Sequence, residues 1–101
     1  MCGIFFFSGN GGEMGIEQAF AGGGGRGPDS STLFFDHRLN TWIGFHRLAI
    51  NGMTASADQP LVIDGCRLIC NGEIYNHKEL CEQTGLESTT GSDCEVIIRL
   101  Y

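Results

Sequence analysis

Residues 61–70 of the chain read LVIDGCRLIC, and this stretch carries the clearest local structural signal in the sequence. Two short apolar runs flank the pair Asp64-Gly65. Asp-Gly is a preferred pair at the centre of a type I′ turn, because both residues there take positive φ angles and the turn matches the twist of the flanking strands. The stretch therefore predicts a β-hairpin.

Two helices are expected after the hairpin. Asn76 precedes Glu79 by three residues, and Ser92 precedes Glu95 by the same spacing. Both pairs have the pattern of a capping box, in which the two side chains bond to each other's backbone amides at the start of a helix. The second helix is expected to carry one apolar face, formed by Val96, Ile97, Leu100 and Tyr101.

Strands and a short helix are expected before the hairpin. Ile4 to Phe7 is a continuous apolar run, which predicts a short strand buried on both faces. Residues 21–31 (AGGGGRGPDSS) predict a loop, because four consecutive glycines and a proline oppose a helix. The other expected elements are a helix over Glu13–Phe20, strands over Thr32–Phe35 and Thr41–Leu48, and a loop over residues 52–60. This mixture predicts an α+β fold.

Composition limits the classes of function. The chain has 101 residues, 42% of them hydrophobic, which fits one small domain with a packed core. Its net charge is -6 and its 6 basic residues are scattered, so neither nucleic acid nor a membrane surface is an expected partner. No apolar run approaches the ~20 residues of a membrane span, and no signal peptide is recognisable. Five cysteines without a secretory signal indicate a reduced, cytoplasmic protein with mostly buried thiols.

The most suggestive single residue is Cys2. If Met1 is removed, the thiol and a free α-amino group lie on one residue. The amine has a reference pKa of about 7.7–8.0, so an unprotonated fraction can act as the base that activates its own thiol. The apolar run that follows would anchor this nucleophile. A passive cysteine in a core strand is the alternative.

Three other stretches offer polar groups for an amino-acid pocket. Asn71 and Gly72 lie where the second hairpin strand ends and could form an oxyanion hole, although an ordinary turn is the alternative. Arg47 could clamp a carboxylate through two parallel hydrogen bonds, or lie at the rim of a strand. Glu73 and Asp93 could bind an ammonium group, although Asp93 could also be an ordinary helix-end carboxylate.

These stretches, taken in order and spacing, resemble class II glutamine amidotransferases over essentially the whole chain. The closest resemblance is to the N-terminal glutaminase domain of glutamine-hydrolysing asparagine synthetase. The matching segments are MCGI, RGPDS, GFHRLAI, QPL, NGEIYNHKEL and SDCEVIIRLY. Each segment is weak alone, and their combination is specific. One departure is Gly25, which stands where relatives often have histidine before the RGPD motif.

The resemblance implies a role for each candidate residue. Cys2, exposed by loss of Met1, would attack the side-chain amide of glutamine, and its α-amine would shuttle the proton. Asn71 and Gly72 would hold the oxyanion. The glutamine-binding residues would be Arg47 for the carboxylate, Glu73 and Asp93 for the ammonium, and main-chain groups over residues 48–51, in particular Leu48, Ile50 and Asn51.

The resemblance also implies the wider architecture. The fold would be the α/β/β/α sandwich of N-terminal-nucleophile hydrolases, of which residues 1–101 are expected to form only the N-terminal portion. A synthetase domain or chain would receive the ammonia and activate aspartate with ATP and Mg²⁺. Neither metal nor cofactor is therefore expected in this chain. A homodimer is a further expectation for the full-length protein.

Three hypotheses remain open at the level of sequence. The chain is the glutamine-hydrolysing part of an asparagine-synthetase-like protein, a non-catalytic module that binds an amino acid or a partner, or an inactive gene fragment. The last helix has no closing signal after Tyr101, which points to a longer domain. We therefore expect residues 1–101 to hold the site but not to act as a competent enzyme alone.

Overall fold

Strand β3 (Thr41–Arg47) is the centre of a three-stranded antiparallel sheet of order β1–β3–β2. In the computed structural model, which describes residues 1–50 and 54–101, β1 spans Gly3–Ser8 and β2 spans Ser30–Asp36. Because β3 is hydrogen-bonded along both edges, nearly all of its residues are buried. The strand is the most deeply buried element of the sheet.

Strand β1 corrects one prediction, because it is not buried on both faces. Phe5 lies under helix α1 (Glu13–Ala21), with its ring in edge contact with Phe20 at 5.8 Å. Ile4 and Phe6 point to the other face and are 52% and 66% exposed. Phe6 lines a cavity of about 450 Å³ between the sheet and the hairpin, so the described residues cover this face incompletely.

Helix α1 is held on the sheet by aromatic contacts. Phe20 stacks on the buried ring of His46 at 4.0 Å between centroids. A Cβ atom at Gly44 would lie 2.6 Å from the Phe20 ring, so only glycine admits this close approach. A short 3₁₀ turn, η1 (Gly24–Arg26), then leads the chain out of the glycine run, which was expected to be loop throughout.

The predicted hairpin is confirmed. Strands β4 (Leu61–Ile63) and β5 (Cys66–Leu68) pair antiparallel, and φ is 50° at Asp64 and 80° at Gly65, as a type I′ turn requires. Arg67 donates to the Asp36 carboxylate at 2.8 Å and lies over the Phe34 ring at 4.5 Å. These contacts tie the hairpin to β2.

Both predicted helices after the hairpin form, but neither capping box does. Helix α2 spans His77–Thr84 and α3 spans Glu95–Leu100, and neither helix start has a side-chain cap hydrogen bond. Glu79 instead accepts a hydrogen bond from Gln83, and Glu95 binds the loop before its own helix. Both carboxylates are engaged by these other donors, and the N-cap of α3 is Cys94, two residues after the Ser92 that the pattern predicts.

The buried face of α3 also differs from the prediction. Glu95, Val96 and Ile98 are buried, whereas Leu100 and Tyr101 are exposed. The helix lies on β4 and β5 and beside α2, so its inward side is set by these neighbours. Of the predicted apolar face, only Val96 is fully buried, and Ile97 is half-buried.

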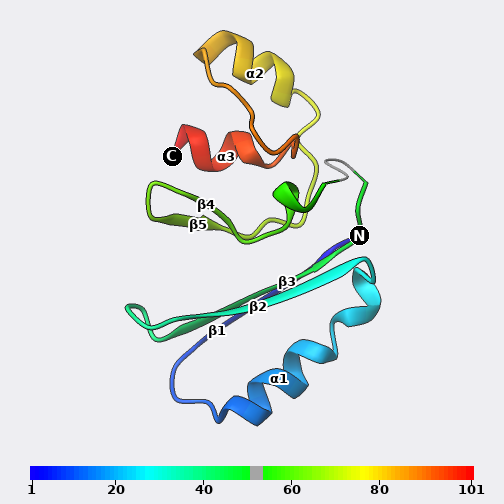
Figure 1. The fold of residues 1–101 in the computed structure, drawn as a ribbon, viewed down its shortest axis with the longest axis vertical. Helices are drawn as coiled ribbons and strands as arrows, with labels where there is room; N and C mark the ends of the chain where they lie inside the picture. Colours follow the sequence, from blue (N-terminus) through cyan, green and yellow to red (C-terminus); the bar gives the residue numbers. More distant parts are fainter. Residues whose placement is uncertain (51–53) are drawn as a thin grey trace.

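The elements stack in four layers (Figure 1). Helix α1 lies on one side of the three-stranded sheet, the hairpin lies on the other side, and α3 and α2 lie beyond the hairpin. A 3₁₀ turn, η2 (Ala55–Ala57), lies in the segment that connects β3 to β4. This mixture of layered helices and strands confirms an α+β fold.

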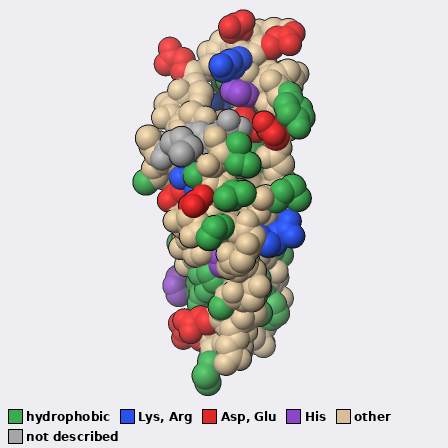
Figure 2. Space-filling view, turned by 90° about the vertical axis from the view of Figure 1, so that its right-hand side faces the viewer, with side chains coloured by type: hydrophobic (Ala, Val, Ile, Leu, Met, Phe, Trp, Pro, Cys, Tyr) green, Lys and Arg blue, Asp and Glu red, His purple; other side chains and the backbone are tan. Residues whose placement is uncertain are grey.

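Figure 2 shows one face of the molecule, with acidic side chains gathered over its upper end and several hydrophobic side chains on its middle part. Cys94 is buried and the other four cysteines are half-buried, so the expectation of mostly buried thiols is wrong.

Within residues 1–50 and 54–101, no helix is long and apolar enough to cross a membrane.

The buried carboxylate of Glu95 provides a test of this packing. It accepts hydrogen bonds from Thr89, Thr90 and Arg99, and these bonds outweigh burial and hold its pKa well below the ordinary value. Glu95→Gln should lower the free energy of unfolding by about 3 kcal/mol near pH 7, because these donors lose a charged acceptor. Urea denaturation of the protein would measure the loss.

The exposed Glu82→Gln on α2 is the matched control and should change stability by less than about 0.5 kcal/mol. A carboxyl with a depressed pKa in the folded state contributes stability above its unfolded pKa of about 4.3 and loses it as the pH falls. The difference in the free energy of unfolding between wild type and Glu95→Gln should therefore become smaller below that pH. If the two proteins differed in their free energy of unfolding by the same amount at pH 3 and at pH 7, this explanation would be wrong.

Candidate active site: a pocket beside the chain start

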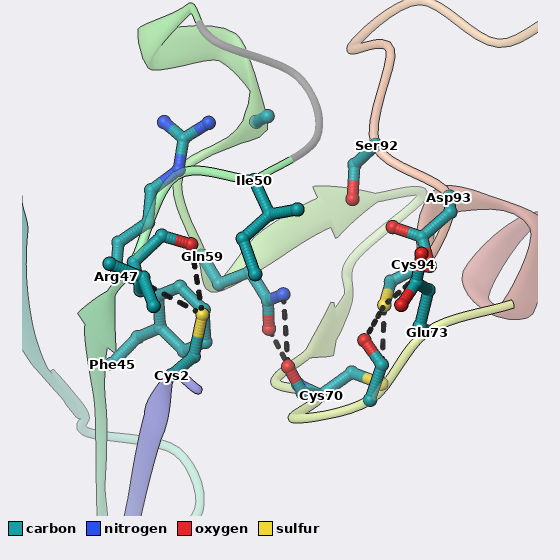
Figure 3. Close-up of a pocket in the computed structure, with 13 residues that line it drawn as sticks. Cys2, Phe45, Arg47, Ile50, Gln59, Cys70, Glu73, Ser92, Asp93 and Cys94 are labelled. Atoms are coloured by element: carbon teal, nitrogen blue, oxygen red, sulfur yellow. Dashed lines mark hydrogen bonds between the residues drawn. The ribbon is translucent and has the colours of Figure 1, made fainter. Parts of the chain in front are cut away.

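A small cavity of about 80 Å³ opens where the end of β3, the segment after β5 and the turn before α3 meet (Figure 3). One side carries Cys2 and Arg47, and the other carries Glu73 and Asp93. The lining residues are Cys2, Phe45, Arg47, Leu48, Ile50, Ala57, Gln59, Cys70, Gly72, Glu73, Ser92, Asp93 and Cys94. The cavity thus combines a thiol, a cation and two carboxylates.

Cys2 is placed by the pairing of β1 with β3. Gly3 pairs with His46, so Cys2 lies against the residues that follow β3. The N–H of Leu48 donates to Sγ of Cys2 at 3.3 Å, and the thiol lies 3.5 Å from the Leu48 carbonyl oxygen. Nε of Arg26 donates to the Cys2 carbonyl oxygen at 3.2 Å. The start of the chain is therefore anchored at the pocket.

The RGPDS segment is hydrogen-bonded to the end of β3 and to the residues that follow it. The Asp29 N–H donates to the Arg47 carbonyl oxygen at 2.9 Å, and the Asp29 carboxylate accepts from the Ala49 N–H at 2.7 Å. A Cβ atom at Gly27 would lie 2.3 Å from the His46 carbonyl oxygen, so no larger residue fits there. The sequence alone assigns no role to the residues of this motif.

Arg47 is a buried residue rather than a rim residue. Its side chain extends from β3 toward η2, where Nη1 donates to the Asp58 carboxylate at 2.5 Å and to the Thr54 carbonyl oxygen at 2.9 Å. Ser30 also donates to the Asp58 carboxylate, at 3.3 Å. The guanidinium group is thus oriented by the Asp58 carboxylate, which no sequence motif indicates as part of the site.

The segment after β5 reaches the pocket through Gly72 and Glu73, which line it. Asn71 is exposed and is not among the lining residues. Two contacts fix the segment: Gln59 bonds the main chain of Cys70, and the Asp93 carboxylate accepts from the Ile74 N–H at 2.6 Å. Asp93 therefore holds the neighbouring loop with one carboxylate oxygen.

A pair of thiols, Cys70 and Cys94, lies at the same wall. The Sγ atoms of Cys70 and Cys94 are 3.3 Å apart, and Sγ of Cys94 also lies 3.9 Å from the Asp93 carboxylate. Burial raises the pKa of the Cys94 thiol well above its ordinary value, and the neighbouring Cys70 and Asp93 raise it further. Cys94 therefore stays a neutral thiol.

The pocket gathers every predicted site residue that the structure describes except Asn71, while Asn51 lies outside the described residues. The residues that sequence reasoning missed are Asp58, Gln59, Cys70, Ser92 and Cys94. The QPL segment contained a signal for Gln59, because it was part of the family resemblance. Among residues 1–50 and 54–101, no group of three or more His, Cys, Asp or Glu side chains could hold a metal ion.

Comparison with known proteins assigns the class. The family model described as a glutamine amidotransferase domain matches residues 1–101, so the chain belongs to the glutamine amidotransferase domain family. No solved structure matches the chain.

Three similar curated proteins are asparagine synthetases or probable ones. The glutamine-hydrolysing asparagine synthetase of Sandersonia aurantiaca is 49% identical over 79 residues, which cover 75% of this chain and 14% of that protein. The enzyme of Arabidopsis thaliana is 43% identical over 79 residues, covering 75% and 13%. A probable asparagine synthetase of Acanthamoeba polyphaga mimivirus is 32% identical over 108 residues, covering 100% and 20%. The chain thus spans no more than a fifth of the length of these relatives.

The raised pKa of Cys94 predicts its reactivity. Iodoacetamide reacts with thiolates, so at pH 8 Cys94 should be alkylated at least tenfold more slowly than the half-buried Cys66 and Cys81. Peptide mass spectrometry after timed alkylation of the folded protein would measure each rate. In urea the rates should become equal. A Cys94 rate equal to that of Cys66 in the folded protein would contradict the assignment.

Proposed function

We propose that this chain hydrolyses glutamine to glutamate and ammonia within an asparagine-synthetase-like glutamine amidotransferase. One observation carries the proposal: Cys2, next to the chain start, lines the same pocket as Arg47 and two carboxylates. A zwitterionic amino acid needs both signs of charge in its site, and hydrolysis of its amide needs a nucleophile close by. Membership of the glutamine amidotransferase family supports the choice of substrate.

The nucleophile is Cys2 after loss of Met1. The freed α-amine takes the thiol proton, directly or through a water, and the thiolate attacks the side-chain amide carbon of glutamine. The amine then returns the proton to the leaving nitrogen, and ammonia departs, leaving a γ-glutamyl thioester. Water, deprotonated by the same amine, hydrolyses the thioester and releases glutamate. No histidine partner is required.

The charged walls orient the substrate. Arg47 binds the glutamine carboxylate, with Asp58 fixing the direction of its guanidinium group. Glu73 and Asp93 bind the α-ammonium from the opposite wall. Leu48 and Ile50 also line the pocket, and their main-chain groups would contact the bound glutamine. The Asn51 expected beside them lies outside the described residues.

The developing oxyanion is held by the Gly72 N–H and the Asn71 side chain. Gly72 lines the pocket, whereas Asn71 is exposed in this state of the molecule. Its side chain therefore has to turn inward when substrate binds. Catalytic hydrogen bonds are commonly completed only in the substrate complex.

The wider proposal follows the family. The four layers of Figure 1 support the N-terminal-nucleophile α/β/β/α sandwich, of which residues 1–101 form the N-terminal portion. A synthetase domain or chain would accept the ammonia and use ATP and Mg²⁺ to activate aspartate. The relatives are named glutamine-hydrolysing asparagine synthetases, which supports a synthetase domain or chain as the acceptor of the ammonia. The free state of the five cysteines supports the cytoplasm as the compartment.

The first test removes the nucleophile. Cys2→Ala in the protein at its natural length should abolish ammonia release from glutamine, because neither the thiolate nor a thioester can form. Asparagine synthesis from added ammonia should continue at the wild-type rate. Coupled assays of glutamate and asparagine formation would measure both. Wild-type glutamine hydrolysis in the Cys2→Ala protein would refute the proposal.

The second test concerns the clamp. Arg47→Lys should weaken apparent glutamine affinity nearly as much as Arg47→Ala, by about 2–4 kcal/mol, because a point charge cannot reproduce the planar guanidinium fork. The dependence of ammonia release on glutamine concentration gives the values. Near-normal affinity in Arg47→Lys would place the carboxylate clamp elsewhere.

A further inference from the structure

Asp58 and Gln59 are neighbours in the chain but act on different walls of the pocket. The Asp58 carboxylate accepts from Arg47 and from Ser30. The Gln59 side chain is 5% exposed and reaches to the main chain of Cys70. One dipeptide therefore touches both the cationic wall and the segment that carries the predicted oxyanion hole.

Gln59 continues the hairpin ladder with its side chain. Leu61 pairs with Leu68, so residue 59 stands opposite Cys70 in the same register. Nε2 of Gln59 donates to the Cys70 carbonyl oxygen at 3.2 Å, and Oε1 accepts from the Cys70 N–H at 2.5 Å. Both main-chain groups of Cys70 are thereby fixed one residue before Asn71. Figure 3 shows this pair of bonds.

Asp58 has the corresponding role for the guanidinium group. Its carboxylate holds Nη1 of Arg47, and Ser30 of strand β2 anchors the carboxylate from the sheet side. An arginine side chain has several rotatable bonds, so an oriented guanidinium group loses less entropy when a ligand binds. The ion pair thus prepares Arg47 for a second carboxylate.

We propose that Asp58 and Gln59 are the positioning residues of the two walls: Asp58 aims Arg47 at the α-carboxylate of glutamine, and Gln59 holds the chain that presents the Gly72 N–H to the oxyanion. The proposal rests on the glutamine hydrolysis proposed above. Neither residue contacts a reacting atom. Each acts through the residue that it holds.

The two residues should have different kinetic signatures. The α-carboxylate of glutamine keeps its charge throughout the reaction, so an oriented Arg47 binds ground state and transition state alike, and its loss raises KM. The oxyanion exists only near the transition state, so a displaced Gly72 N–H lowers kcat. Partial unfolding would lower the apparent kcat through the amount of folded protein and leave KM unchanged, so kcat is expressed per folded molecule, with the folded fraction measured by circular dichroism.

The test uses Asp58→Asn and Gln59→Met in the protein at its natural length, with ammonia release from glutamine as the assay. Asp58→Asn should raise KM about tenfold with kcat within twofold of wild type. Gln59→Met keeps the side-chain length but loses both bonds to Cys70. It should lower kcat about 30- to 100-fold with KM within threefold.

Matched controls are available in the same chain. Asp64→Asn lies in the hairpin turn, where asparagine also tolerates a positive φ, and Gln83→Met lies on the exposed surface of α2. Both controls should leave KM and kcat within twofold of wild type. If Gln59→Met does not fold, Gln59→Glu replaces it, because it retains the acceptor for the Cys70 N–H and loses only the donor.

The outcomes separate the two levels of proposal. If the wild-type protein releases ammonia but both variants keep wild-type KM and wild-type kcat per folded molecule, the positioning roles are overturned and the function stands. If the wild-type protein, with Met1 removed, releases no ammonia from glutamine, both proposals fall. A KM effect confined to Asp58→Asn and a kcat effect confined to Gln59→Met support the assignment.

Discussion

The candidate site depends on the antiparallel pairing of β1 with β3. The first residues of a chain are usually loose, because few contacts hold a terminus. Here six consecutive pairs from Gly3–His46 to Ser8–Thr41 fix β1 along its whole length. Cys2 is therefore held in contact with Leu48, and its thiol takes a defined position although it is next to the chain start. Every proposed catalytic step begins from this position.

The second half of the site comes from the turn before α3 and the first residue of that helix, where Ser92, Asp93, Cys94 and Glu95 are buried. Burying polar groups is unfavourable unless they are hydrogen-bonded, and each of these carboxylates has partners. Asp93 binds the Ile74 N–H, and Glu95 binds the loop at Thr89 and Thr90. Through these bonds, Asp93 holds the segment after β5, and Glu95 holds the loop at Thr89 and Thr90.

Three thiols line the pocket: Cys2 and Cys70 are half-buried, and Cys94 is buried. Burial and a neighbouring carboxylate raise the pKa of Cys94, so this thiol cannot supply a thiolate near neutral pH. Cys2, by contrast, lies at the other wall with a guanidinium group nearby and would gain its own α-amine on loss of Met1. Cys2 is the proposed nucleophile because, among the thiols that line the pocket, it is the one that would carry a free α-amine.

The sequence by itself determined the local elements and the residue types of the site. The Asp64-Gly65 turn was readable because its φ requirement is local, and the apolar run after Cys2 was readable as a strand. The capping boxes at Asn76 and Ser92 failed because Glu79 and Glu95 bind donors elsewhere. Tertiary structure alone decided the partners of Arg47 and Cys70, since Asp58 and Gln59 reach them across loops whose path no local pattern specifies. It also decided which face of α3 is buried, because that depends on where the hairpin and α2 pack against it.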